Sequence, residues 1–205
     1  MQRVGLMGGS FNPIHCGHLN LARAALDAGM VDEVLFMPSG NPPHKRAGLE
    51  DKLHRLHMAA AAIEGEPGMA ICREEVDREG VIYTVDTLAL LREKRPDCRF
   101  FYLIGADTLR TLHTWRRPED VVRLCTLLVA ARPGEDDAQL PRLMAHWRAR
   151  GAEIEVLPAA CIDVSSTEIR ERIAAGLSLS GLVPPGVERY IRLHGLYQMG
   201  EEASP

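Results

Sequence analysis

Short apolar runs alternate along the chain with longer stretches in which apolar residues recur every three or four positions. Residues 4–7 (Val-Gly-Leu-Met) and 34–37 (Val-Leu-Phe-Met) are typical of the first kind and predict short buried strands. Residues 19–28 are typical of the second kind and predict a helix with one apolar face. The same criteria predict strands at 69–74, 100–104, 127–131 and 154–157, and helices at 49–63, 85–94, 118–124, 139–150, 167–175 and 185–193. Gly151 is expected to act as the C-cap of the helix that ends at 150.

Strands that alternate with helices predict an α/β fold, a doubly wound parallel sheet covered by helices on both faces. In such sheets ligands bind outside the carboxyl ends of the strands, so chemistry is expected at the strand-to-helix turns. We expect one catalytic α/β domain over residues 1–177 and a small helical C-terminal extension over 178–199. Residues 200–205, Gly-Glu-Glu-Ala-Ser-Pro, are expected to form a disordered tail.

Composition narrows the function classes. The chain has 205 residues, 46% of them hydrophobic, and 24 basic against 28 acidic side chains give a formal charge of -4. This balance argues against a nucleic-acid or anionic-membrane binder that works by bulk charge. The five cysteines are widely spaced and form no C-x-x-C, which disfavours a disulfide framework or a zinc ribbon. With no secretory h-region and no apolar stretch of membrane-spanning length, a cytoplasmic location is expected.

The turn after the first strand carries the strongest chemical signal. Gly8 and Gly9 lack a Cβ and let the backbone approach a ligand closely, and the helix that follows offers free N–H groups to an anion. His15 and His18 stand at the start of that helix, where imidazole N–H groups suit phosphate oxygens. Neither the Walker pattern nor the dinucleotide fingerprint is present, so a dehydrogenase loses its main support. Structural histidines, a zinc site with Cys16 and a Cys16 nucleophile are the alternatives.

A second turn, residues 165–170 (Ser-Ser-Thr-Glu-Ile-Arg), opens a helix late in the chain. Ser165 and Glu168 fit a capping box, so a well-capped helix explains them without any ligand. Arg170 is different, because helical side chains lean toward the N-terminus and a cation there faces the positive end of the dipole. A bound polyphosphate would compensate that charge.

Taken together, these strings resemble the nucleotidyltransferase superfamily, with its [HT]-x-G-H after a Gly-rich turn and its S-[ST]-x-x-[IL]-R. Between them lie residues 42–45 (Pro-Pro-His-Lys), 83–88 (Tyr-Thr-Val-Asp-Thr-Leu) and 105–107 (Gly-Ala-Asp), followed by Trp115. Their order and spacing are similar to the bacterial nicotinate-nucleotide adenylyltransferase family, over roughly residues 1–195. The resemblance implies a Rossmann-like nucleotidyltransferase fold. It also implies that ATP and nicotinate mononucleotide are converted to nicotinate adenine dinucleotide and pyrophosphate, in NAD biosynthesis.

The resemblance also implies roles for single residues. The catalytic residues are expected to be His15, His18 and Arg170, with His18 nearest the α-phosphate. Other ATP-binding residues are expected to be Gly8, Gly9, Ser10, Gly17, Ser165, Ser166 and Thr167. Mononucleotide-binding residues are expected to be Asn12, Lys45, Thr84, Asp107 and Trp115, whose indole would stack on the pyridinium ring. Mg²⁺ is expected as the cofactor, held mainly by the ATP phosphates rather than by a protein metal site.

Several alternatives stay open at this stage. The same chemistry can act on nicotinamide mononucleotide or pantetheine phosphate, and a non-catalytic nucleotide-binding module can keep the fold. Thr84 and Asp107 can be helix caps, and Trp115 can be a core residue. Cationic neighbours such as Arg116 favour an acceptor that carries a carboxylate. A homo-oligomer remains open.

Overall fold

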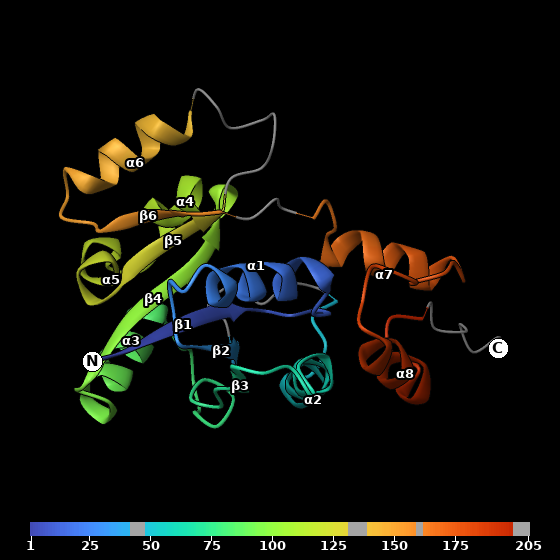
Figure 1. The fold of residues 1–205 in the computed structure, drawn as a ribbon. Helices are drawn as coiled ribbons and strands as arrows, with labels where there is room; N and C mark the ends of the chain where they lie inside the picture. The colour runs from blue at the N-terminus through green and yellow to red at the C-terminus, as the bar shows by residue number, and fades with distance from the viewer. Residues whose placement is uncertain (42–47, 131–138, 159–161, 199–205) are drawn as a thin grey trace.

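A parallel six-stranded sheet forms the centre of the computed structural model, which describes residues 1–41, 48–130, 139–158 and 162–198 (Figure 1). The strands are β1 (Gln2–Gly9), β2 (Glu33–Pro38), β3 (Met69–Ile71), β4 (Cys98–Gly105), β5 (Thr126–Ala130) and β6 (Ile154–Leu157). Their order is β3-β2-β1-β4-β5-β6, and every neighbouring pair is parallel. The doubly wound sheet is therefore confirmed. The strand order reverses between β1 and β4, which is where such sheets form a ligand crevice.

Helices cover both faces of the sheet. They are α1 (Cys16–Asp27), α2 (Lys52–Ala62), α3 (Thr84–Lys94), α4 (Ala106–Thr111), α5 (Pro118–Leu124), α6 (Leu140–Arg148), α7 (Ser166–Ala174) and α8 (Pro185–His194), with a 3-10 turn at Leu112–Thr114. Side chains of β4 alternate between two cores. Phe101 and Leu103 pack with α1, α2, α7 and α8, whereas Phe100 and Tyr102 pack with α3 to α6. No helix in the described part of the chain is long and apolar enough to cross a membrane.

Several local expectations differ from the structure in the bounds or caps of an element. Helix α1 begins at Cys16 rather than at 19, so His18 lies inside its first turn and His15 is its N-cap. Strand β3 ends at Ile71, because the chain then enters a turn that carries Glu75 into the interior. Gly151 is not a C-cap, which is a correction to the sequence-based expectation. Helix α6 already ends at the C-cap Ala149, and Gly151, with φ of 89°, forms the turn toward β6.

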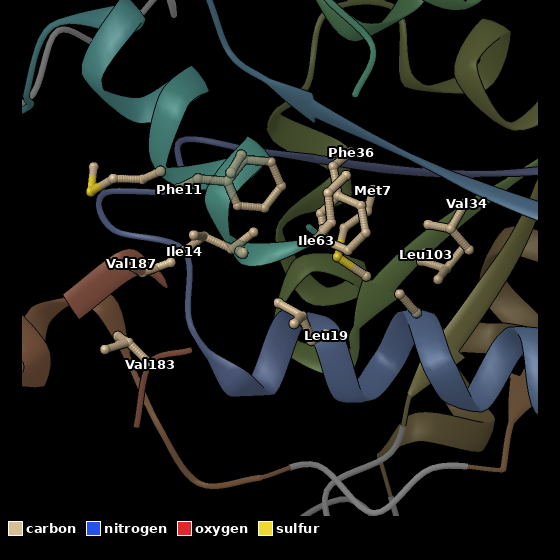
Figure 2. Packing of buried hydrophobic residues seen from close by; sticks show 14 of the residues in the cluster. Met7, Phe11, Ile14, Leu19, Val34, Phe36, Ile63, Leu103, Val183 and Val187 are labelled. Atoms are coloured by element: carbon tan, nitrogen blue, oxygen red, sulfur yellow. The ribbon is translucent and has the colours of Figure 1, made fainter. Parts of the chain in front are cut away.

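The segment between β1 and α1 is anchored by its own apolar side chains. Phe11 and Ile14 are almost completely buried, and Figure 2 shows them pointing into the core formed with Phe36 and Leu19. Val187 of α8 belongs to the same core, and α8 packs along α2. Figure 1 places α7 and α8 on the side toward which β1 runs. The C-terminal helices therefore support the carboxyl end of the sheet.

A buried arginine joins the loops that follow β1 and β2. Arg55 of α2 is 1% exposed. Its guanidinium donates hydrogen bonds to the carbonyl oxygens of Ser10 (2.7 Å), Ser39 (2.7 Å), Gly40 (3.1 Å) and Glu50 (3.0 Å). A buried charge is tolerated only when such partners replace water. The requirement therefore fixes the positions of both loops relative to α2.

Gly40 is confined by this arrangement, and Gly40→Ala is expected to destabilise the fold. A Cβ at Gly40 would lie 2.0 Å from the backbone carbonyl oxygen of Glu75, and backbone atoms have little freedom to move. Overpacking of this kind costs about 1–3 kcal/mol or more, measurable as the free energy of unfolding in urea. Gly105→Ala is the matched control, because its added Cβ would meet no atom of the described residues within 4 Å, its two chain neighbours aside. Equal losses in the two variants would contradict the packing argument.

Candidate active site

A cavity of about 520 Å³ opens at the carboxyl ends of β1 and β4, within the roughly 300–1,000 Å³ typical of small-molecule sites. It brings together most of the residues that the sequence indicated. Its wall includes Gly8, Gly9, Ser10, His15, Gly17, His18, Thr84, Asp107 and Trp115. Segments from both halves of the sheet therefore meet at the reversal of the strand order.

The two histidines form a stacked pair at the N-terminus of α1. Their ring centroids lie 3.7 Å apart, and the His15 backbone N–H donates a hydrogen bond of 3.2 Å to Nδ1 of His18. Burial lowers the pKa of His15 to about 4, and burial together with repulsion from His15 holds the pKa of His18 well below its usual range. Both rings are therefore neutral at pH 7. Because Nδ1 of His18 accepts a hydrogen bond, its single ring proton resides on Nε2.

His15 leaves one polar atom unsatisfied. Its Nδ1 is buried without a hydrogen-bond partner in the described part of the chain. Gly17 makes room for this atom, since a Cβ at position 17 would lie 3.0 Å from it. This nitrogen lies next to the N–H groups at the start of α1, which suit a ligand that carries oxygens.

Gly8 allows β1 to end directly above Tyr102 of β4. A Cβ at position 8 would lie 2.0 Å from the Tyr102 hydroxyl oxygen. Burial raises the pKa of Tyr102 well above its ordinary value, against a smaller opposing effect of the Thr84 hydroxyl. Trp115 contacts the Tyr102 ring edge-on, with centroids 5.8 Å apart. Thr84, Tyr102 and Trp115 thus form one aromatic and hydroxyl-bearing wall of the cavity.

Asp107 and Arg116 flank this wall. Asp107 lines the cavity and forms an ion pair of 2.5 Å with Arg110, one turn further along α4. The Arg116 guanidinium lies over the Tyr83 ring, 4.6 Å from its centroid, and does not line the cavity. Arg116 is therefore engaged by an aromatic ring next to the wall that Thr84 contributes.

Helix α7 docks on the segment after β1 rather than on the cavity itself. Ser166 donates a hydrogen bond of 2.8 Å to the Pro13 carbonyl, and Arg170 donates one of 2.8 Å to the Asn12 carbonyl. Arg170 also reaches back to the Thr167 hydroxyl at 3.2 Å, which confirms the expected lean toward the first turn. Ser165 is the N-cap and accepts a hydrogen bond from the Glu168 backbone N–H.

The structure does not bring Asn12 into the cavity wall. Asn12 is 6% exposed, and its side-chain amide donates to the Gly48 carbonyl. The amide oxygen accepts hydrogen bonds from the Glu50 backbone N–H and the Tyr197 hydroxyl. Lys45 lies outside the described residues, as do its neighbours in 42–47.

Two functional candidates were missed from the sequence, Glu75 and Arg55. Glu75 is 7% exposed and lines the cavity. Burial raises its pKa to about 7, against the opposing effects of the Thr87 hydroxyl, Arg78 and Arg55. Its position just after a predicted strand was the available signal, since the carboxyl end of a strand faces the ligand crevice.

The zinc alternative has no support in the described part of the chain. No group of three His, Cys, Asp or Glu side chains there has the geometry to hold a metal ion. The four cysteines with described side chains, Cys16, Cys72, Cys98 and Cys125, are free thiols. Burial raises the pKa of the Cys16 thiol, which disfavours the thiolate that a nucleophile or metal ligand needs.

Known proteins are similar to this chain in sequence and in fold. Residues 6–172 match the family model described as cytidylyltransferase-like. The chain is 39% identical over 201 residues to the "probable nicotinate-nucleotide adenylyltransferase" of Neisseria meningitidis serogroup B, covering 97% of this chain and 100% of that protein. It is 42% identical over 198 residues to a protein of the same name from Bordetella avium, covering 97% and 99%.

A solved structure has the same fold. The nicotinic acid mononucleotide adenylyltransferase of Plasmodium falciparum complexed with NaAD matches with a TM-score of 0.79 at 17% sequence identity. The match covers 96% of this chain and 98% of that chain. At this identity the likeness is one of fold, and it extends over nearly the whole of both chains.

The histidine pair predicts a specific loss of stability in acid. The pKa of His15 is about 4 in the folded protein against an ordinary value of 6.5, so the unfolded chain binds the extra proton first. Stability is therefore lost as pH falls from 6.5 toward 4, by about 3 kcal/mol for this residue. In His15→Gln this contribution is absent. The free energy of unfolding should therefore fall by about 3 kcal/mol less than in the wild type between pH 6.5 and pH 4. The control His113→Gln, at an exposed position, should retain the wild-type dependence, and an unchanged dependence in His15→Gln would contradict the account.

Proposed function

The chain belongs to the cytidylyltransferase-like family, and we propose that it transfers the adenylyl group of ATP to nicotinate mononucleotide. A phosphate oxygen of the mononucleotide attacks the α-phosphorus of ATP, the bond from that phosphorus to the β-phosphate oxygen breaks, and pyrophosphate leaves. One observation carries this proposal. The His15–His18 pair and the Thr84–Trp115 wall line one cavity at the reversal of the strand order. The names of the relatives that cover the whole chain support it.

The phosphate side consists of groups fixed before substrate binds. Nε2–H of His18 is proposed to donate to the α-phosphate, from a rigid helical turn rather than a mobile loop. His15, the α1 N-terminus and the backbone of Gly8 and Gly9 are proposed to hold the rest of the triphosphate. Because the acceptor phosphate is already ionised, no general base is required, and positioning and electrostatics supply the catalysis.

Helix α7 is proposed to complete the triphosphate site. The two described hydrogen bonds of Arg170 use two of the five N–H donors of its guanidinium. The remaining donors are proposed to bind phosphate, with hydroxyl or amide groups from Ser165, Ser166 and Thr167. The carbonyl of Asn12 then holds the guanidinium in place, so Asn12 acts through its backbone on the phosphate side.

The acceptor side is proposed to be the wall formed by Thr84, Asp107 and Trp115. A flat pyridinium ring stacks favourably on an indole face, and Trp115 lines the cavity with one ring edge on Tyr102. Asn12 and Lys45 are proposed to contribute to mononucleotide binding, as the resemblance to the family implies. Nicotinate mononucleotide is proposed as the preferred acceptor over nicotinamide mononucleotide and pantetheine phosphate.

Mg²⁺ is proposed as the cofactor. The described residues contain no cluster of three metal-ligating side chains, so the ion would be held mainly by phosphate oxygens, as Mg²⁺ commonly is. Asp107 is a cavity-wall carboxylate that fits such a partly substrate-held ion. When bound, Mg²⁺ would neutralise charge on the leaving pyrophosphate.

A cytoplasmic location is proposed because the four cysteines with described side chains are free, which fits a reducing compartment. The proposed partners are ATP and nicotinate mononucleotide, with neither nucleic acid nor a membrane. A homo-oligomer is a further proposal that light scattering of the purified protein would test.

The proposed activity is tested with purified protein, ATP, Mg²⁺ and a panel of acceptors, by measuring pyrophosphate release. Nicotinate mononucleotide should exceed nicotinamide mononucleotide by about 10²-fold or more in kcat/KM. The two acceptors differ by one carboxylate, and a site that satisfies its charge discriminates strongly against the amide. Pantetheine phosphate should be inactive. Turnover of pantetheine phosphate alone would assign another acceptor, and ATP binding without turnover of any acceptor would indicate a non-catalytic module.

His18→Ala should fold, bind ATP within a few-fold of wild type and lose about 10²–10³ in kcat. That is the usual effect of removing one donor aimed at developing charge. Single-turnover kinetics and equilibrium ATP binding separate the two effects. His18→Asn keeps an acceptor for the His15 N–H and guards against a folding defect.

Cys16→Ser is the matched control for His18, because it lies two residues away on the same helical turn and the chemistry needs no thiol. It should retain kcat. A near-wild-type kcat in His18→Ala would contradict the assigned role, and so would a properly folded but inactive Cys16→Ser.

A further inference from the structure

Glu75 places a buried carboxyl group in the wall of the cavity. The proposed adenylyl transfer assigns no role to this group. Glu75 lies in the turn between β3 and α3, and its backbone carbonyl packs against Gly40. Glu75 is 7% exposed and lines the cavity together with Thr84 and Trp115. Among the described residues, only the Thr87 hydroxyl donates a hydrogen bond to this carboxyl group, to Oε1 at 3.1 Å.

The charged groups that act on Glu75 come from α2 and from its own turn. Arg55 of α2 and Arg78 of the same turn both favour its ionised form. The guanidinium of Arg55 is already shared among backbone carbonyls, and one guanidinium nitrogen of Arg78 is buried without a partner in the described part of the chain. Tyr102 of β4 stays neutral, because burial raises its pKa. None of these groups forms a direct ion pair with Glu75 within the described residues.

The two candidate pyridine acceptors differ in the charge that they would bring to this wall. The nicotinamide ring of a mononucleotide carries one positive charge, whereas the nicotinate ring carries that charge and a carboxylate, and is neutral in sum. An ionised Glu75 attracts the first and repels the carboxylate of the second, at a low effective dielectric. A protonated Glu75 removes that repulsion and presents an O–H donor to the carboxylate.

We propose that Glu75 is a specificity-determining residue, whose carboxylic acid form admits nicotinate mononucleotide and whose ionised form favours nicotinamide mononucleotide. The inference rests on the proposed function and deepens it. It makes the preference between acid and amide depend on the protonation state of one buried side chain. Because burial raises the pKa of Glu75 to about 7, the change of form falls within the range in which the enzyme can be assayed.

The test is the ratio of kcat/KM for nicotinate mononucleotide to kcat/KM for nicotinamide mononucleotide, measured from pH 6 to pH 8. Both acceptors share the phosphate, the ribose and the ATP site, so titration of those groups cancels in the ratio. With a pKa of about 7 the protonated fraction of Glu75 falls about tenfold over this range. The wild-type ratio should fall by about tenfold or more.

Glu75→Gln should abolish this pH dependence and keep the ratio high at pH 8, because an amide cannot ionise and its oxygen still accepts from Thr87. The matched control is Glu74→Gln, one residue away, where Glu74 is paired with Lys94. It should follow the wild-type curve. A wild-type ratio that does not change with pH, or an equal slope in Glu75→Gln, would overturn the proposal.

Thr87→Val provides an independent variant in case Glu75→Gln does not fold. It removes the hydrogen bond that lowers the pKa of Glu75, so the midpoint of the fall should move to higher pH. An unmoved midpoint would also overturn the proposal. If neither mononucleotide is turned over, the proposed function fails. The same ratio is then taken from the dissociation constants of the two mononucleotides by calorimetry, which tests Glu75 on its own.

Discussion

The hydrogen bonds of one buried guanidinium constrain most of the candidate site. Arg55 cannot be buried unless its N–H groups find oxygens, and it finds them on the loops that follow β1 and β2. Removing the guanidinium would leave several buried carbonyl oxygens without a hydrogen-bond partner. Each such unpaired group typically costs about 1–3 kcal/mol of stability. The need to pair the Arg55 guanidinium therefore holds both loops against α2. Gly40 belongs to one of them and packs directly against the backbone of Glu75.

The segment after β1 is held from three directions, so the groups proposed to bind phosphate are positioned before any ligand binds. Arg55 holds the Ser10 carbonyl, the core holds Phe11, and α7 bonds the carbonyls of Asn12 and Pro13. Groups positioned in advance need no reorganisation when charge develops, and such groups supply most electrostatic catalysis. The C-terminal helices thus take part in the site by fixing the backbone on which α1 begins.

The sequence predicted all six strands, because most of them are short apolar runs, although β6 includes Glu155 and β3 has no buried residue. Gly8, His15 and His18 were also recognisable, since all three fall in the short stretch from the end of β1 to the first turn of α1. The start of α1 was placed too late, because Gly17 and His18 have low helix propensity, whereas the structure begins the helix at Cys16. Local propensity carries no information about the surrounding core that stabilises this first turn.

Arg55 and Glu75 were missed for a different physical reason. Charged residues are exposed in most proteins, and only the tertiary structure shows that these two are enclosed. The inward path of the turn after β3 likewise depends on Gly40, which is distant in sequence. The side chain of Asn12 was assigned to the acceptor from the resemblance alone, whereas in the structure its amide is engaged by Gly48, Glu50 and Tyr197.

The central claim is that Arg55 holds the loops on which adenylyl transfer depends, and Arg55→Lys tests it most directly. A lysine keeps the charge but donates from one nitrogen, so it cannot span carbonyls on separate loops. The variant should unfold cooperatively with reduced stability, and its kcat should fall at least about tenfold, since small misplacement of fixed groups is costly. Arg73→Lys, on an exposed pair with Asp77, should change neither quantity. A folded Arg55→Lys protein with wild-type kcat would contradict the account.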